Sequence, residues 1–214
     1  MPNPSQIFSH ESLAGIPEPE LVRRLLADSH WRSRFVGLHG IPTDANDYRE
    51  VLLDGLGKKG DVDILVVNPS RPEFATAIQT KRIKVATQTF QTGKPNRLVA
   101  IAELYRQTNI LVELGFWQVL CYAIITVDSR MNNNGEYRYD GLTTDLRTTI
   151  NASLSTEGLH QDAGFVRFEL AQPIDHYPLG AGTFSTTLLR GSTVRPQSAN
   201  VTNWVNRVVA ERDA

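Results

Sequence analysis

The chain has 214 residues, of which 41% are apolar and 21% charged, a composition typical of a soluble globular protein with enough sequence for one sizeable domain. No apolar run reaches the roughly 18 residues of a membrane-spanning helix, which excludes an integral membrane protein with helical spans. The first residues lack the basic start and apolar stretch of a secretory signal, so we expect a cytoplasmic protein. The one cysteine, Cys121, excludes an internal disulfide and a cysteine-based zinc cage.

Charge is unevenly distributed along the chain. The formal net charge is −1, which excludes a uniformly basic nucleic-acid-binding protein. All five lysines nevertheless fall between residues 58 and 94, and residues 49–106 hold ten basic against six acidic side chains. This segment predicts a local basic patch that can attract a polyanion, with an ordinary solvated face as the alternative.

The N-terminal part predicts a loose arm followed by two helices. Residues 1–16 form the arm, and residues 18–28 repeat leucines at the spacing of a short amphipathic helix. The second helix is expected from about residue 44 to the glycines at 55 and 57, with Asp44 or Asn46 as its cap. The apolar side of this helix would consist of Tyr48, Val51 and Leu52.

The next four segments alternate between strand and helix patterns. Residues 61–67 and 75–85 are β-branched runs separated by a turn, so they are expected to pair as a hairpin. Residues 97–114 place apolar side chains on one face at a spacing of about 3.6 residues, which predicts a helix. Residues 116–127 are almost wholly apolar, as in a strand covered by other elements on both faces.

The C-terminal part predicts further elements of the same unit. After a polar loop at 131–141, we expect a helix at 143–154, strands at 164–171 and 184–191, and a terminal helix with an apolar face. We therefore expect one domain over residues 1–214. Its parts are an N-terminal arm and helix (1–43), a core (44–130), and a C-terminal extension of the sheet with the terminal helix (131–214).

Three polar side chains occupy strand positions from which they can converge. Asp63 stands near the start of the run at 61–67, and Gln79 and Lys81 lie two residues apart in the run at 75–85. Side chains alternate across a strand, so Gln79 and Lys81 point to the same face. If the two runs pair, a carboxylate, an amide oxygen and an ammonium group meet at one edge of the sheet.

These three groups suit metal-dependent hydrolysis of phosphodiesters. Mg²⁺ is a hard cation that takes oxygen ligands, often one or two carboxylates with water and a substrate phosphate. Asp63 would hold the cation, and the side-chain oxygen of Gln79 would be a neutral second ligand. Lys81 would orient the attacking water or stabilise charge that develops in the transition state.

The pattern resembles the PD-(D/E)XK nuclease superfamily and, in its Gln-x-Lys-Arg form, the Mrr-type restriction endonucleases. The matching residues are Gly60, Asp61, Asp63, Gln79, Lys81 and Arg82. The expected order of helix, β-hairpin, helix and strand over residues 44–127 is similar to the core of that family. Family members usually have one more strand before the aspartate. Here only residues 56–60 separate the expected helix from the strand, so we expect that extra strand to be very short, displaced or absent.

The resemblance implies a restriction-endonuclease-like α/β fold, with a mixed central sheet flanked by helices and with additional C-terminal strands and a helix. It also implies a divalent-metal-dependent endonuclease that cuts DNA, with a role in restriction or defence. Its catalytic residues would be Asp63, Gln79, Lys81 and Glu50. The ligands of Mg²⁺ (or Mn²⁺) would be Asp63, Gln79 and Glu50; Glu50 is included because family members often carry an acidic residue on the helix before the motif.

The same resemblance implies double-stranded DNA as the partner, no membrane, and a homodimer that supplies one active site per strand. The basic residues expected to contact nucleic acid are Lys58, Lys59, Arg82 and Lys84. Two alternatives stay open. A neutral Gln79 in place of an acidic residue weakens metal affinity, which is compatible with an inactive nuclease-fold subunit that binds nucleic acid or assembles with other proteins. Asp63 and Lys81 could also form only a structural ion pair, because a carboxylate at a core edge needs a partner.

Overall fold

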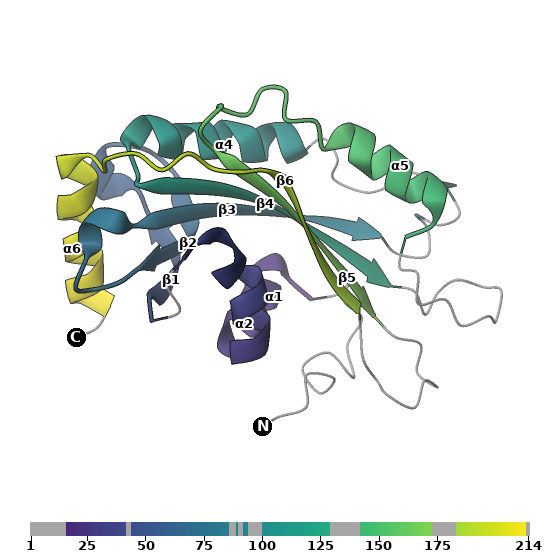
Figure 1. Cartoon of the computed structure of the whole chain (residues 1–214), viewed down its shortest axis with the longest axis horizontal. Coiled ribbons are helices and arrows are strands. Elements are labelled where there is room, and N and C mark those ends of the chain that lie inside the picture. The colour runs from purple at the N-terminus through teal and green to yellow at the C-terminus, as the bar shows by residue number, and fades with distance from the viewer. Residues whose placement is uncertain are drawn as a thin grey trace.

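The computed structural model describes residues 16–41, 44–85, 89, 92–93, 100–128, 142–172 and 183–212. Within these residues the chain is an α/β protein with a six-stranded mixed sheet and five α-helices (Figure 1). None of the helices in these ranges is both long enough and apolar enough to cross a bilayer. The polar loop expected at 131–141 and the arm expected at 1–16 lie outside the described residues, except for Ile16.

The strands lie in the sheet in the same order as in the chain, β1-β2-β3-β4-β5-β6. The first three form an antiparallel meander, β3 and β4 pair in parallel, β4 and β5 pair in parallel, and β6 returns antiparallel to β5. Their bounds are β1 Asn46–Leu52, β2 Asp61–Val67, β3 Thr76–Val85, β4 Gln118–Asp128, β5 Gly164–Gln172 and β6 Thr183–Arg190. The expected hairpin of residues 61–67 and 75–85 and the strands of the C-terminal part are thus confirmed.

Helices cover both faces of the sheet. Alternate residues of β4 belong to different core clusters: Leu120, Tyr122 and Ile124 pack with α1 and α2, whereas Cys121, Ala123 and Ile125 pack with α4 and α5. A third cluster joins the terminal helix to β1 and β2. The helix bounds are α1 Glu18–Ala27, α2 Ser29–Phe35, α4 Ala100–Leu114, α5 Thr144–Ser153 and α6 Ala199–Arg212.

The apolar run that contains β4 is covered on both faces, as expected. Every residue of the strand from Val119 to Val127 is buried. Cys121 therefore has no contact with solvent, and burial raises the pKa of its thiol to about 12. The cysteine belongs to the core beneath α4 and carries no surface chemistry.

The helix predicted from about residue 44 to residue 54 is wrong, because these residues form β1 and a short 3₁₀ turn, η3 (Asp54–Leu56). The ladder of β1 and β2 keeps one register from Asn46↔Val67 to Leu52↔Asp61, but it skips Glu50, whose φ is 49°. This irregular residue interrupts the alternation of the strand, so that Tyr48 and Val51, three positions apart, pack in the same cluster. The strand expected to be very short, displaced or absent before Asp63 is therefore present.

Candidate functional site

The residues predicted to carry chemistry lie where β2 and β3 part from one another. The two strands pair only from Ile64↔Ile78 to Val66↔Thr76. Beyond that point β2 continues beside β1 as far as Asp61, and β3 continues beside β4 as far as Val85. The diverging ends form a fork, in which polar side chains of both strands stand where no ladder joins the strands.

Gln79 bridges the fork with its side-chain amide. Its Nε2 donates to the carbonyl oxygen of Asp61 at 2.7 Å, and its Oε1 accepts from the backbone N–H of Asp63 at 3.2 Å. These two bonds replace the ladder that the strands no longer form, and the side chain is only 2% exposed. The predicted neutral ligand thus lies beside Asp63, but its oxygen already serves the β2 backbone.

Asp63 points its carboxylate across the fork at β3. Its Oδ2 accepts from the backbone N–H of Thr80 at 2.6 Å and lies 3.2 Å from the Thr80 hydroxyl oxygen, which donates to it. The pKa of this carboxyl is raised from 3.8 to about 6, chiefly by burial and to a smaller extent by the negative charges of Asp61 and Glu18, while the hydrogen bonds from Thr80 act in the opposite direction. Asp63 is therefore a carboxylate whose charge the surrounding protein only partly compensates.

A cavity of about 260 Å³ opens at the fork, between α1, α4 and the ends of β1, β2 and β3. Three of the four residues predicted to be catalytic line it, and Gln79 does not. Its walls consist of Glu18, Pro19, Val22, Arg49, Glu50, Asp61, Asp63, Thr80, Lys81 and Gln107. The structure therefore brings a carboxylate-rich wall and one ammonium group together around a small open space.

Lys81 reaches this cavity without a salt-bridge partner among the described residues. The structural ion pair with Asp63, considered from the sequence, is thus not formed. The pKa of the Glu103 carboxyl on α4 is lowered, chiefly by the hydrogen bond from Arg106. The positive charge of Lys81 adds a smaller effect in the same direction. No ion pair with a described residue therefore keeps Lys81 from facing a bound anion.

Glu18 is a site residue that the sequence did not suggest. It stands in the first turn of α1, and its Oε1 lies 3.4 Å from the Thr80 hydroxyl, which also donates to Asp63. The helix itself was expected from its leucine spacing, but nothing in the chain indicates that residue 18 meets residues 63 and 80. The only available signal is the acidic first turn of α1, which is also an ordinary way to stabilise a helix start.

Glu50 lines the cavity from β1 rather than from a helix. Its position in the ladder lies between the pairs Arg49↔Ile64 and Val51↔Val62, and therefore opposite Asp63. Among the described residues it is the one non-glycine with positive φ, a conformation that costs on the order of 1–3 kcal/mol and is concentrated at functional sites. This outlier marks the same place in the sheet as the fork.

The four residues predicted to contact nucleic acid divide into two groups. Lys58 and Lys59 are exposed in the loop between η3 and β2. Arg82 is 2% exposed, and its guanidinium donates to the carbonyl oxygen of Ile16 on the side of the sheet covered by α1 and α2. Lys84 is partly buried and follows two positions later on the strand. Only the first pair lies on open surface.

The donors at the fork fit a hard cation in part. Within the described part of the chain, no three Asp, Glu, His or Cys side chains lie close enough to hold a metal ion by themselves. Mg²⁺ does not need three, since one or two carboxylates completed by water and phosphate oxygens are common. Asp63 and Glu18 offer such a pair, and a cation between them would offset the like charges that raise the pKa of Asp63.

Comparison of the chain with protein-family models, with curated proteins and with solved structures finds no match in any of the three. A functional assignment therefore depends on the geometry of the fork and on the chemistry of the groups around it.

Proposed function

We propose that the protein is a divalent-metal-dependent endonuclease that hydrolyses DNA phosphodiester bonds. The observation that carries the proposal is the meeting of Asp63, Glu18 and Lys81 around one cavity at the β2–β3 fork. The order α1, β1, β2, β3, α4, β4 supports a similarity to the PD-(D/E)XK nuclease core, now with the additional strand before the aspartate. The role in restriction or defence is part of this proposal.

Each residue of the cavity has a distinct role in this proposal. Asp63 and Glu18 would hold Mg²⁺ or Mn²⁺, with Glu50 opposite Asp63 as the predicted further ligand. When bound, the cation lowers the pKa of water and offsets charge on the scissile phosphate. Lys81, unpaired among the described residues, would orient the attacking water or stabilise the developing negative charge.

Gln79 remains a predicted ligand, but its amide is already bonded at both ends to the β2 backbone. We therefore assign it the task of fixing the fork, so that Asp63 faces Thr80 and the cavity. A positioned carboxylate contributes more to catalysis than a mobile one, because the geometry needs no reorganisation during the reaction.

The proposal is tested by plasmid cleavage. Purified protein with Mg²⁺ should nick or linearise supercoiled DNA, whereas Lys81→Ala and Asp63→Asn should lose at least about 100-fold in rate, the usual effect of removing one group that acts on the transition state. The control is Arg147→Ala, which removes a half-exposed charge on α5, a helix that contributes no residue to the lining of the cavity. Equal rates for Lys81→Ala and the wild type would refute the assignment.

A second candidate is a nuclease-like subunit that binds nucleic acid without cutting it. The engagement of Gln79 with the backbone favours it, since this leaves the fork with fewer oxygens for a cation. It predicts salt-sensitive DNA binding with no cleavage in Mg²⁺ or Mn²⁺. Cleavage by the wild type that is lost in Asp63→Asn decides between the two candidates.

A further inference from the structure

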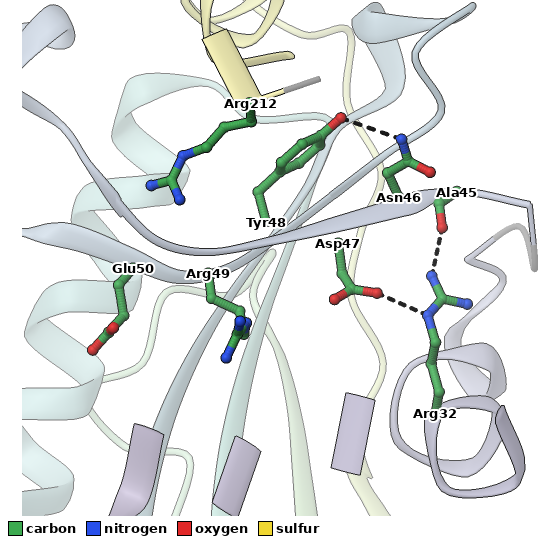
Figure 2. A pocket seen from close by; sticks show the side chains of 8 residues that line it. All are labelled: Arg32, Ala45, Asn46, Asp47, Tyr48, Arg49, Glu50 and Arg212. Atoms are coloured by element: carbon green, nitrogen blue, oxygen red, sulfur yellow. Dashed lines mark hydrogen bonds and ion pairs between the residues drawn. The ribbon is translucent and has the colours of Figure 1, made fainter. Parts of the chain in front are cut away.

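A second and larger cavity runs along the outer edge of β1. Its volume is about 660 Å³, and every side chain that lines it, except Ala45, is polar or charged. Figure 2 shows these residues: Arg32, Ala45, Asn46, Asp47, Tyr48, Arg49, Glu50 and Arg212. They come from three parts of the chain, namely α2, the region of β1, and the last turn of α6.

The side chains of this groove stand on both sides of the edge strand β1. β1 is the first strand of the sheet and, among the residues that the structure describes, pairs with β2 alone. In Figure 2 the side chains of Tyr48 and Arg212 lie on one side of the β1 ribbon, and those of Asp47 and Arg49 lie on the other. A ligand along this edge would meet side chains of both rows and the outward backbone groups between them.

Two guanidinium groups of the groove have no partner within the described residues. Arg32 is satisfied by Asp47 at 2.9 Å and by the carbonyl oxygen of Ala45 at 2.5 Å, and its ion pair neutralises the Asp47 carboxylate. Arg49 and Arg212 form no salt bridge or hydrogen bond there. Among the described residues, the groove therefore presents two guanidinium groups without an ion-pair partner, and Glu50 is its remaining acidic group.

The groove adjoins the cavity at the fork, because Arg49 and Glu50 line both. The backbone around Glu50 explains how these two residues reach both spaces. Both Arg49 and Glu50 are exposed, although they are neighbours in a strand, because the positive φ of Glu50 breaks the alternation. A polymer bound along β1 would thus lie beside the cavity that Asp63 and Lys81 line.

We propose that this groove, through Arg49 and Arg212, binds the phosphate backbone of duplex DNA and places it at the fork. Unpaired guanidinium groups bind phosphate oxygens with charge-assisted hydrogen bonds, and outward N–H groups of the strand edge can add to them. The choice of a duplex follows from the lining, whose one aromatic ring, Tyr48, is 7% exposed and offers no face for an unstacked base. The substrate class depends on the proposed nuclease function; the binding itself does not.

The test measures binding without chemistry. Fluorescence anisotropy of a short fluorescein-labelled duplex is titrated with protein in EDTA at several salt concentrations, for the wild type and for the Arg49→Ala/Arg212→Ala double variant. We expect the variant to bind about tenfold more weakly per arginine removed. The salt dependence of log K should also fall by about one per lost phosphate contact. Arg147→Ala is the matched control and should bind as the wild type does.

The outcomes separate this inference from the proposed function. Equal affinity and equal salt slope for the wild type and the double variant would overturn the proposal that the groove binds DNA, even if the wild type cuts DNA. Tighter binding of the separated single strand than of the duplex would overturn the choice of ligand. Absence of binding to either probe also overturns it. Duplex binding that depends on the two arginines, without cleavage in Mg²⁺, would support the groove and remove the nuclease assignment.

Discussion

Asp63 carries a charge that the folded protein tolerates poorly. Its pKa rises from 3.8 to about 6 on folding, chiefly through burial. A group that binds its proton more tightly in the folded state stabilises the fold below its unfolded pKa and loses that contribution as the pH rises through the folded value. Between about pH 4 and pH 6, the ionisation of Asp63 therefore costs the protein up to about 3 kcal/mol.

Replacing this carboxyl by its isosteric amide should consequently stabilise the fold at high pH. Asp63→Asn keeps an acceptor for the Thr80 N–H and removes the charge, so its free energy of unfolding at pH 8 should exceed that of the wild type by about 1–3 kcal/mol. At pH 4 the difference should nearly vanish, because Asp63 is protonated there in the fold. Urea unfolding at the two pH values measures both quantities.

The exposed Glu157 supplies the control, since Glu157→Gln makes the same chemical change in open solvent and should leave stability within about 0.5 kcal/mol at either pH. A destabilised Asp63→Asn at pH 8 would mean that the carboxylate is well compensated in the fold. The ionisation of Asp63 would then give no reason to expect a cation at the fork.

How far the sequence determined the site differs from residue to residue. Asp63 and Lys81 were predicted to lie near one another, and both line the cavity at the fork, because consecutive strands of a hairpin lie side by side. Glu18 was missed because it reaches Thr80 from a helix 62 residues away, and no local pattern records such a contact. The bonds of the Gln79 amide were also beyond prediction, since they depend on where β2 and β3 separate.

At the scale of single elements, the regular strands and helices were predictable and the irregular strand was not. The strands β2, β3 and β4 were predictable from their apolar runs. The helices α1 and α4 were predictable from apolar side chains that recur at helical spacing. In β1, Tyr48 and Val51 are both buried at a spacing of three, which imitates a helix, because the backbone at Glu50 changes the repeat within the strand. This irregularity, together with residues typical of helix ends at 44, 46, 55 and 57, made the segment resemble a helix.

The fork between β2 and β3 depends on an amide rather than a carboxylate, which gives a second prediction. Gln79→Glu loses the N–H that bonds the Asp61 carbonyl and introduces a charge beside Asp63 in a buried place. We expect its free energy of unfolding, measured with urea at pH 8, to fall by at least about 2 kcal/mol.

Gln107→Glu makes the same substitution on the α4 wall of the cavity at the fork, where the amide forms no hydrogen bond with described residues, and should cost much less. The two variants together also test the ligand role predicted for Gln79. If that role is dominant, Gln79→Glu should bind Mg²⁺ more tightly than the wild type in a calorimetric titration and keep its stability. This result would contradict the assignment of the Gln79 amide to holding the two strands together.

At the scale of the whole molecule, the terminal helix α6 packs against the first two strands of the sheet. Val201, Trp204 and Val205 of α6 are buried against β1, β2 and the start of β4, in one cluster with Tyr48 and Phe116. The sequence predicted the apolar face of this helix but not its destination, because a contact across 152 residues, such as that of Arg207 with Gly55, leaves no local trace. The apolar face of α6 is thus covered by other elements of the same chain.

The packing of α6 against η3 is sensitive to a single methyl group at residue 55. A Cβ at Gly55 would lie 2.8 Å from a ring carbon of Trp204 and 2.7 Å from the Arg207 guanidinium, so Gly55→Ala must push α6 away from η3. We expect a loss of about 1–3 kcal/mol in thermal or urea unfolding. Gly191→Ala, where the added carbon would meet nothing within 4 Å, is the control. Equal stability of the two variants would show that α6 is not tightly seated.

The interior position of Cys121 has a practical consequence. A thiol that stays protonated beneath α4 does not react with maleimides, and the chain contains no other cysteine. The native protein is therefore a ready background for site-directed spin labelling. A pair of introduced cysteines, one on α5 and one near the end of α6, would report by electron resonance how the two ends of the sheet move when a nucleic acid arrives.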